Sequence, residues 1–153
     1  MTGDDLRALL REVPAPVSVV TVGARQPVGL TLNTFVSLSL EPPLVGFAIA
    51  TQAALHELLR ETGAFALSIL ASGQEHLAQH FARGVPPIGL WVGVETRTGE
   101  LGAPLIEGAL GWIECRLRSE HATGDHTFFV GEVVSAKRGP GREVLVHLRQ
   151  GYS

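Results

Sequence analysis

Hydrophobic and polar positions along the chain predict short strands separated by sharp turns. Apolar runs of strand length cover residues 17–22, 28–40, 44–50, 64–70, 109–119, 126–136 and 143–148. Prolines between the first three runs mark the turns. The run 28–40 is long for one strand, so we expect it to bend near Thr31. The last three runs follow one another through short turns and predict an antiparallel meander.

Three segments change from the two-residue period of a strand to the period of a helix. The first, residues 2–12, is expected to form a short helix that docks on the rest of the molecule. The second begins at Thr51, which can act as its N-cap, and ends at Gly63. The third begins with Ser72 and Glu75, which have the spacing of a capping box.

This order of elements predicts a mainly β fold, an antiparallel barrel with two or three short peripheral helices. Helices inserted between runs of strands do not give the repeated alternation of a doubly wound parallel sheet. Residues 84–108 hold glycine, proline and few periodic apolar positions, so an irregular excursion with room for one short strand is expected there. No linker or repeat interrupts the chain, and residues 1–153 are expected to form one domain.

Charge and composition exclude several classes of function. The formal net charge is −3 and Lys137 is the only lysine, which is unlike a surface that binds nucleic acid or an anionic membrane. No apolar run approaches the roughly 18 residues of a membrane span, and the acidic N-terminal segment is unlike a secretory signal. A cytoplasmic protein that binds neither nucleic acid nor membranes is therefore expected.

The common catalytic and metal-binding motifs are absent. The chain has no phosphate-binding loop, no three-glycine dinucleotide fingerprint and no hydrolase elbow. His76 and His80 are four residues apart, but no glutamate of the HExxH type and no further ligands accompany them, so no metal site is expected. Cys115 alternates into the apolar face of its strand, which favours a core position over a reactive thiol.

Residues 29–39 are unusual because polar side chains recur where the hydrophobic pattern predicts a buried strand. Two interpretations remain open. The Thr and Asn side chains can satisfy backbone groups at a bend that Gly29 permits. Alternatively, backbone N–H groups and the amide of Asn33, the only asparagine, form a cradle for a heteroaromatic ligand.

Two further positions also have a structural and a functional interpretation. Thr51 can be a helix cap alone, or the start of a phosphate site built from the hydroxyl and free amides of residues 51–53. His126 lies in a turn that leads into a strand. It can be an ordinary solvated histidine or a group that titrates near neutral pH beside a ligand.

Taken together, these stretches resemble the flavin reductase-like proteins of the FMN-binding split-barrel group. The resemblance runs from about Leu6 to Tyr152. Its specific parts are the Gly-x-Thr stretch at residues 29–34 and the Gly-Asp-His turn at residues 124–126. Weaker support comes from residues 37–39, 42–44, 81–82, 111–115 and 151–152.

The resemblance implies a six-stranded split β-barrel that forms a homodimer, with FMN or FAD in a groove beside the dimer interface. NADH or NADPH would transfer hydride to the flavin, and the reduced flavin would supply a partner monooxygenase. The protein would contribute orientation and electrostatics rather than a nucleophile. The apolar character of both faces of strand 126–136, apart from Glu132, agrees with cover by the barrel on one side and a partner on the other.

Carried over by position, the resemblance implies the following roles. Gly29 opens the flavin-binding stretch, and Thr31, Leu32, Asn33 and Thr34 line the isoalloxazine and ribityl chain. Ala50, Thr51 and Gln52 hold the phosphate. Phe81 closes one side of the flavin site, His126 is the catalytic residue beside the nicotinamide, and Tyr152 lies near the flavin from the C-terminal tail.

The chain also departs from the family pattern. Asn33 replaces a small hydroxyl residue, and residues 83–89 replace a charged and aromatic segment. No basic side chain lies near the predicted phosphate site in the sequence, which leaves Arg83, a second subunit or backbone amides to fill that role.

Two other functions fit the same fold. One is an electron carrier with tightly bound FMN. The other is a non-catalytic module that binds flavin or haem, in which His121 or His126 would be the iron ligand.

Overall fold

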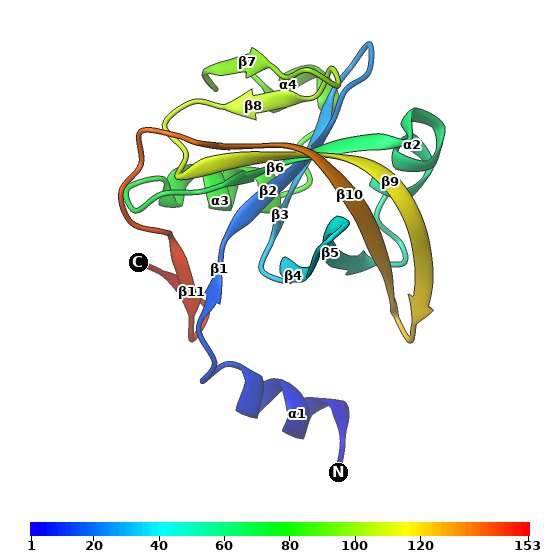
Figure 1. The fold of residues 1–153 in the computed structure, drawn as a ribbon. Coiled ribbons are helices and arrows are strands. Elements are labelled where there is room, and N and C mark those ends of the chain that lie inside the picture. The colour runs from blue at the N-terminus through cyan, green and yellow to red at the C-terminus, as the bar shows by residue number, and fades with distance from the viewer.

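The computed structural model describes residues 1–153, and its centre is one curved antiparallel sheet (Figure 1). The sheet has seven strands in the order β3-β2-β6-β9-β10-β5-β4. Their bounds are β2 Ser18–Val22, β3 Val28–Leu32, β4 Val36–Leu40, β5 Pro43–Ala50, β6 Ala64–Ile69, β9 Gly111–Thr123 and β10 His126–Arg138. The structure is therefore mainly β, as the pattern of short apolar runs predicted.

The predicted strand 28–40 is two strands, because the chain turns away from β2 at residues 33–35. β3 and β4 are consecutive in the sequence but lie at opposite ends of the sheet order. The Thr34 hydroxyl joins the turn between β3 and β4 to β5, since it donates to the Ala48 carbonyl oxygen (2.8 Å) and accepts from the Ala48 N–H (3.0 Å). The expected bend near Thr31 lies two residues too early, and the division gives seven strands instead of six.

The predicted meander of the last three strands is wrong in its final member. β9 and β10 form a long hairpin, as expected. The other side of β10 pairs with β5, so β10 has no free edge for a further strand. β11 (Val146–Leu148) pairs instead with β1 (Ala15–Pro16) and β12 (Gly151–Tyr152) in a small separate sheet.

The first two helices differ from the predictions in different ways: α1 begins as expected but is not docked, and α2 begins later than expected. α1 (Gly3–Leu10) is capped by Thr2, but it buries no residue and stands away from the sheet (Figure 1). It is therefore not docked on its own chain. α2 (Leu55–Thr62) begins behind Ala54, so the predicted capping role of Thr51 is wrong. Gly63 ends α2 with φ of 68°, a left-handed conformation that glycine adopts without strain.

The third predicted helix, α3 (Glu75–Ala82), begins three residues later than the predicted Ser72 cap. No capping box forms there, because the Glu75 carboxylate accepts from the Gly73 N–H instead. The segment 84–108 is more ordered than expected. It contains the short helix α4 (Pro87–Leu90) and the hairpin of β7 (Thr96–Thr98) and β8 (Pro104–Ile106).

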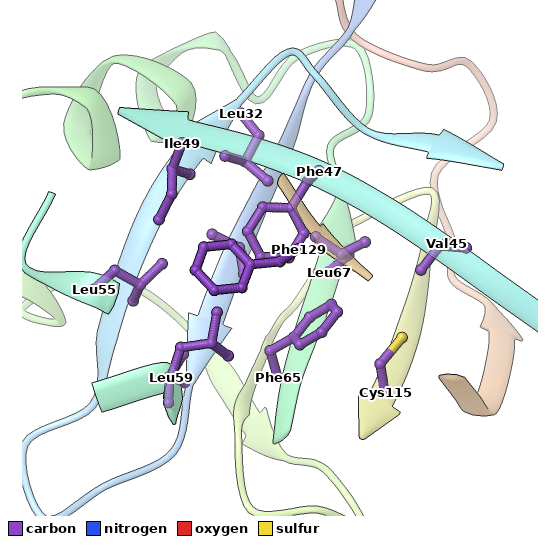
Figure 2. Packing of buried hydrophobic residues seen from close by; sticks show 12 residues of the cluster. Leu32, Val45, Phe47, Ile49, Leu55, Leu59, Phe65, Leu67, Cys115 and Phe129 are labelled. Carbon is purple, nitrogen blue, oxygen red and sulfur yellow. The ribbon is translucent and has the colours of Figure 1, made fainter. Parts of the chain in front are cut away.

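The main hydrophobic core fills the inside of the curved sheet and is covered at one end by α2 (Figure 2). Phe47 contacts the rings of both Phe65 and Phe129, with ring centroids 5.0 and 5.5 Å apart. Cys115 belongs to this cluster and is fully buried, and burial raises the pKa of its thiol to about 12. The predicted core role of Cys115 is confirmed. A second core cluster lies between β2, α3 and α4.

Candidate active site

A cavity of about 410 Å³ lies between β3, β5 and the first residue of β10. Seven of the predicted site residues line it: Thr31, Leu32, Asn33, Thr34, Ala50, Gln52 and His126. Leu30, Ala48, Ile49 and Ala53 complete the lining. Figure 2 shows Leu32 and Ile49 side by side above the aromatic core, which fixes the apolar floor of the cavity.

The sheet itself creates this cavity, because β3 pairs with β2 on one side only. Every second residue of such an edge strand directs its N–H and C=O away from the sheet. Beyond β3, the N–H groups of Asn33, Thr34 and Phe35 form no hydrogen bond within the chain. The split between β3 and β5 therefore presents a row of backbone polar groups to whatever occupies the cavity.

The two predicted threonine hydroxyls are already engaged by the scaffold. The Thr31 hydroxyl donates to the Ala78 carbonyl oxygen of α3 at 2.7 Å. The Thr34 hydroxyl is shared between the N–H and carbonyl of Ala48. Asn33 is exposed, and its side-chain amide lies 3.3 Å from Nδ1 of His147. The structural interpretation of residues 29–39 is confirmed for the two threonine hydroxyls, which bond to backbone groups, and the cradle for a heteroaromatic ligand stays a prediction.

The turn after β5 supplies the opposite end of the cavity. The Thr51 N–H donates to the Asp125 carbonyl oxygen (3.0 Å), and Thr51 does not line the cavity. Gln52 does line it, and its N–H has no partner within the chain. Of the predicted phosphate-binding residues, Ala50 and Gln52 thus face the cavity and Thr51 fixes the turn to the β9–β10 hairpin.

His126 begins β10 directly opposite Ala50. Its Nδ1 lies 2.8 Å from the Asp125 carboxylate, so the proton on that nitrogen is held and Nε2 stays free. The hydrogen bond from His126 is also the largest cause that holds the pKa of Asp125 below its ordinary value. The His126 side chain is 44% exposed and can reach a ligand in the cavity. His121 lies apart from this cavity, with Nε2 3.0 Å from the Ser119 hydroxyl oxygen.

Besides Thr51, three predicted residues lie outside the cavity: Gly29, Phe81 and Tyr152. Gly29 and Phe81 line a neighbouring cavity, and a Cβ atom on Gly29 would lie 3.0 Å from the Phe81 ring. Phe81 is only 1% exposed, so it is a core residue that supports β3 from below. Tyr152 lines a smaller cavity of about 190 Å³ that shares Thr31, Leu32 and Asn33 with the main one.

A basic patch near the cavity was missed by the sequence reasoning. Arg7 and Arg11 of α1 line a further cavity of about 440 Å³, which also includes Asn33 and Thr34. Arg83, the basic residue considered from the sequence, is exposed and lines none of these cavities. The helical pattern of residues 2–12 predicts α1 but does not fix its direction, so nothing in the sequence placed its arginines here.

No cluster of three or more histidine, cysteine, aspartate or glutamate side chains could hold a metal ion. His80, considered earlier with His76, donates from Nε2 to the Leu90 carbonyl oxygen at 2.6 Å and so ties α3 to α4. None of the helices is long and apolar enough to cross a membrane.

These features agree with the comparisons to known proteins, and the chain belongs to the flavin reductase-like domain family, whose model matches residues 10–153. An NADH-dependent FAD reductase of Streptomyces globisporus is 43% identical over 148 residues, which cover 92% of this chain and 79% of that protein. The reductase component of 4-hydroxyphenylacetate 3-monooxygenase of Thermus thermophilus is 39% identical, over 81% of this chain and 76% of that protein.

A solved structure extends the agreement to the fold. The Streptomyces globisporus C-1027 NADH:FAD oxidoreductase SgcE6, in complex with NAD and FAD fragments, matches with a TM-score of 0.92 and 40% identity. The match covers 98% of this chain and 90% of that one. The fold is therefore the split barrel of the flavin reductases, as the resemblance implied.

Proposed function

We propose that this protein is an NADH-dependent flavin reductase that transfers hydride to FMN or FAD and supplies the reduced flavin to a monooxygenase. The observation that carries the proposal is the cavity at the split of the barrel, where the backbone N–H groups of Asn33, Thr34 and Gln52 have no partner and His126 is part of the lining. Relatives about 40% identical over most of the chain are NADH-dependent or NADH:FAD reductases. The proposal assigns this activity to a single domain of residues 1–153. It also assigns the protein to the cytoplasm.

The residues of the cavity fit an isoalloxazine ring better than a substrate that needs a protein nucleophile. The floor is apolar, from Leu30, Leu32 and Ile49, and suits the face of a flat heteroaromatic ring. The free N–H groups of residues 33–35 suit the oxygen and nitrogen acceptors on the edge of such a ring. Bound flavin accepts the hydride, and the protein holds it in place. Hydrogen bonds from these N–H groups also favour the negative charge that the ring gains on reduction.

The nicotinamide is assigned to the side of the cavity where His126 lies. The Asp125 carboxylate holds the imidazole ring through Nδ1, which leaves Nε2 free for a ligand in the cavity that His126 lines. His126 acts by orienting the nicotinamide, because hydride transfer depends on close alignment of the two rings. Tyr152 is proposed to contact the flavin from the adjoining small cavity, and Phe81 supports Gly29 from beneath.

The flavin phosphate is assigned to the turn at Ala50, Thr51 and Gln52. The Gln52 N–H is free, and the turn leads directly into the N-terminus of α2, where backbone N–H groups favour a negative charge. No arginine or lysine lines the cavity, so amide groups carry this contact within one subunit.

We also infer a homodimer, from apolar side chains that the single chain leaves uncovered. Leu9 of α1 is 66% exposed, and Leu40 at the end of β4 is 88% exposed. On β10, Phe128 and Val130 remain partly exposed on the face opposite Phe129, and Val134 is exposed. An eight-residue helix without packing is marginal in water, so α1 needs a surface to rest on. A second copy supplies that surface.

The test is steady-state oxidation of NADH and of NADPH by the purified protein, with FMN, FAD or no added flavin. The proposal predicts turnover with NADH that saturates with added flavin and stops without it. A protein that retains bound FMN and gains nothing from added flavin would be an electron carrier instead. A colourless protein that binds neither flavin would contradict the proposal, and a haem absorbance band would indicate the haem-binding alternative.

A further inference from the structure

Asn33 is the residue at which three cavities of the molecule meet. It lines the proposed flavin cavity of about 410 Å³, the cavity of about 440 Å³ beside α1 and the small cavity of about 190 Å³. No other residue lines all three. The Asn33 side chain can therefore contact a ligand in the flavin cavity and, at the same time, residues that do not line that cavity.

His147 contacts Asn33 from outside the flavin cavity. It lies on β11, beside β1 in the small C-terminal sheet (Figure 1). Its Nδ1 lies 3.3 Å from the amide nitrogen of Asn33. Its ring packs against the ring of Tyr152 on β12, with centroids 5.3 Å apart. His147 lines the two other cavities but not the flavin cavity, so its place is set by the C-terminal sheet.

The contact between two nitrogen atoms fixes the protonation state of His147. An amide nitrogen only donates hydrogen bonds, so Nδ1 must accept and the imidazole proton lies on Nε2. The carbonyl oxygen of the Asn33 amide is then directed away from His147. A protonated imidazole donates from both nitrogens, so only the Asn33 carbonyl oxygen can bond to it. The amide must then turn over, which directs its nitrogen away from His147.

We propose that His147 is a positioning residue of the flavin site, whose protonation state selects the end of the Asn33 amide that faces the flavin cavity. The inference rests on the proposed function. With neutral His147, the cavity receives the carbonyl oxygen, which is an acceptor. With charged His147, it receives the amide nitrogen, a donor that suits the acceptor-rich edge of the oxidised flavin ring. Oxidised flavin therefore binds more tightly when His147 is charged.

The groups around the His147 ring leave Asn33 as the partner that must respond to protonation. The titratable and charged groups come from α1 and the residues after it, the β11–β12 turn, β12 and the flavin cavity: Arg7, Arg11, Glu12, Arg149, Tyr152 and His126. Glu12 is the only carboxylate among them, and it pairs with Arg149 at 2.8 Å. No acidic side chain lines either cavity of His147, so no carboxylate competes with Asn33 for the ring.

Asn33 is the only asparagine of the chain, which gives a direct measurement of its side chain. Protein made with isotope-labelled asparagine shows a single pair of side-chain amide signals in a heteronuclear NMR spectrum. In protein without flavin, we expect these signals to move in one transition between about pH 5 and 8, where histidine changes charge. The ring signals of His147 should follow the same transition. An amide signal that does not respond to pH would overturn the inference.

Variants assign this transition to one histidine. His147→Phe keeps a ring against Tyr152 and removes the titrating nitrogens, so the transition of the Asn33 signals should vanish. His147→Gln, which is polar but does not titrate, should behave in the same way. His121→Ala is the matched control, because His121 lines none of the three cavities. A transition that persists in both His147 variants, or that disappears in His126→Ala, would overturn the inference.

Binding of riboflavin gives a second readout. Riboflavin carries the flavin ring without a phosphate, and a phosphate has its own titration near pH 6, about where histidine titrates. We expect the wild type to bind riboflavin about fivefold more tightly at about pH 5.5 than at about pH 8, as one added hydrogen bond gives. Quenching of the riboflavin fluorescence measures the dissociation constant. The two values should be equal in His147→Phe, and a pH dependence like that of the wild type would overturn the role of His147.

If the wild type binds no flavin at any pH, the proposed function fails. The Asn33 signals of the flavin-free protein then test the coupling between His147 and Asn33 alone. A transition that both His147 variants abolish would support the coupling, and the absence of a transition would overturn it.

Discussion

At the scale of single residues, the cavity is polar through its backbone more than through its side chains. Thr31 and Thr34 lie where the sequence placed them, yet their hydroxyls bond to carbonyl oxygens of the scaffold. Asn33, Gln52 and His126 are the lining side chains with polar atoms that can turn toward a ligand. This arrangement suits a flavin, whose acceptor-rich edge can be held by N–H groups that no substitution of a side chain removes.

His126→Ala tests the proposed role of the histidine at the cavity rim. We expect kcat/KM for NADH to fall about tenfold, because a nicotinamide with one orienting contact fewer reaches the reactive alignment less often. The dissociation constant for flavin should change less than the nicotinamide constants. Stopped-flow reduction and equilibrium flavin titration measure the two effects separately.

His121→Ala is the matched control for this prediction, because His121 is exposed on the neighbouring strand and does not line the cavity. Unchanged NADH kinetics in His126→Ala would remove the residue from the site. An equal loss in His121→Ala would point to a general effect on the β9–β10 hairpin.

Some residues of the candidate site could be predicted from the sequence and others could not, and each outcome has a physical reason. Seven predicted residues converge on the cavity because β5 pairs with the start of β10 and faces β3 across the split of the barrel. The burial of Phe81 could not be predicted, since the apolar face of a helix has the same pattern whether it faces the core or the flavin site. Arg7 and Arg11 were missed because their place depends on how α1 leaves the barrel.

At the scale of elements, backbone conformation decided where the predictions failed. The whole run 28–40 has the pattern of a strand. In the curved sheet, however, its first half pairs with β2 and its second half pairs with β5 at the opposite end of the strand order. The chain therefore breaks at residues 33–35, and that break is also where the N–H groups become free. The failed prediction and the proposed flavin cavity have the same physical cause.

Gly131→Ala tests how tightly β10 packs against the barrel interior. A Cβ atom at Gly131 would lie 2.8 Å from the Cys115 Cβ and would also overlap the Phe65 ring. Both neighbours are fully buried, so overpacking should reduce the free energy of unfolding by about 2 kcal/mol. Urea unfolding measures the change.

Gly3→Ala is the control, because a Cβ atom there meets nothing within 4 Å. Its unfolding free energy should match that of the wild type. An undiminished stability of Gly131→Ala would mean that the core between β6, β9 and β10 is looser than the contacts indicate.

The ion pair between α2 and β9 predicts a pH dependence. The Arg60 guanidinium donates to both Glu120 carboxylate oxygens (2.8 to 3.1 Å), and this contact holds the pKa of Glu120 below its ordinary value of 4.5. A lowered folded-state pKa contributes stability that is complete above 4.5 and is lost as the pH falls through the lowered value. The pair is exposed to solvent, so its contribution is small.

Glu120→Gln should therefore lower the urea midpoint slightly near neutral pH and have no effect in acid below the lowered pKa. Paired unfolding curves across this range measure the difference. A difference that persists or grows in acid would contradict the assignment of the pair as the cause.

At the scale of the whole molecule, large apolar side chains stay exposed on α1 and at the end of β4. α1 projects from the barrel with its leucines uncovered, and its arginines stand beside the cavity that adjoins the proposed flavin site (Figure 1). The mainly β barrel and its peripheral helices could be predicted from periodicity and turn signals. The direction of α1 could not, because it depends on contacts between residues far apart in the sequence, those of Arg149 with Arg11 and Glu12 just after the helix.

Leu9→Glu tests the inferred homodimer. The wild type should have a mass by light scattering of twice the 16.3 kDa of one chain. Leu9 is 66% exposed in the single chain. A charge at this position should shift the measured mass toward that of a monomer, because burying a charge in an apolar contact is costly. Ile88→Glu, at an 85% exposed position on α4, serves as the control and should keep the dimer mass. A wild-type monomer would contradict the inference.

Hydride transfer to free flavin is the central claim, and anaerobic flavin reduction measures it most directly. A catalytic amount of protein is mixed with NADH and a large molar excess of FAD or FMN, and the bleaching of the flavin absorbance is followed to its end. The account predicts that all of the flavin is reduced, with one NADH consumed for each flavin. Reduction that ends after one flavin per protein chain, or that does not exceed the rate without protein, would contradict it.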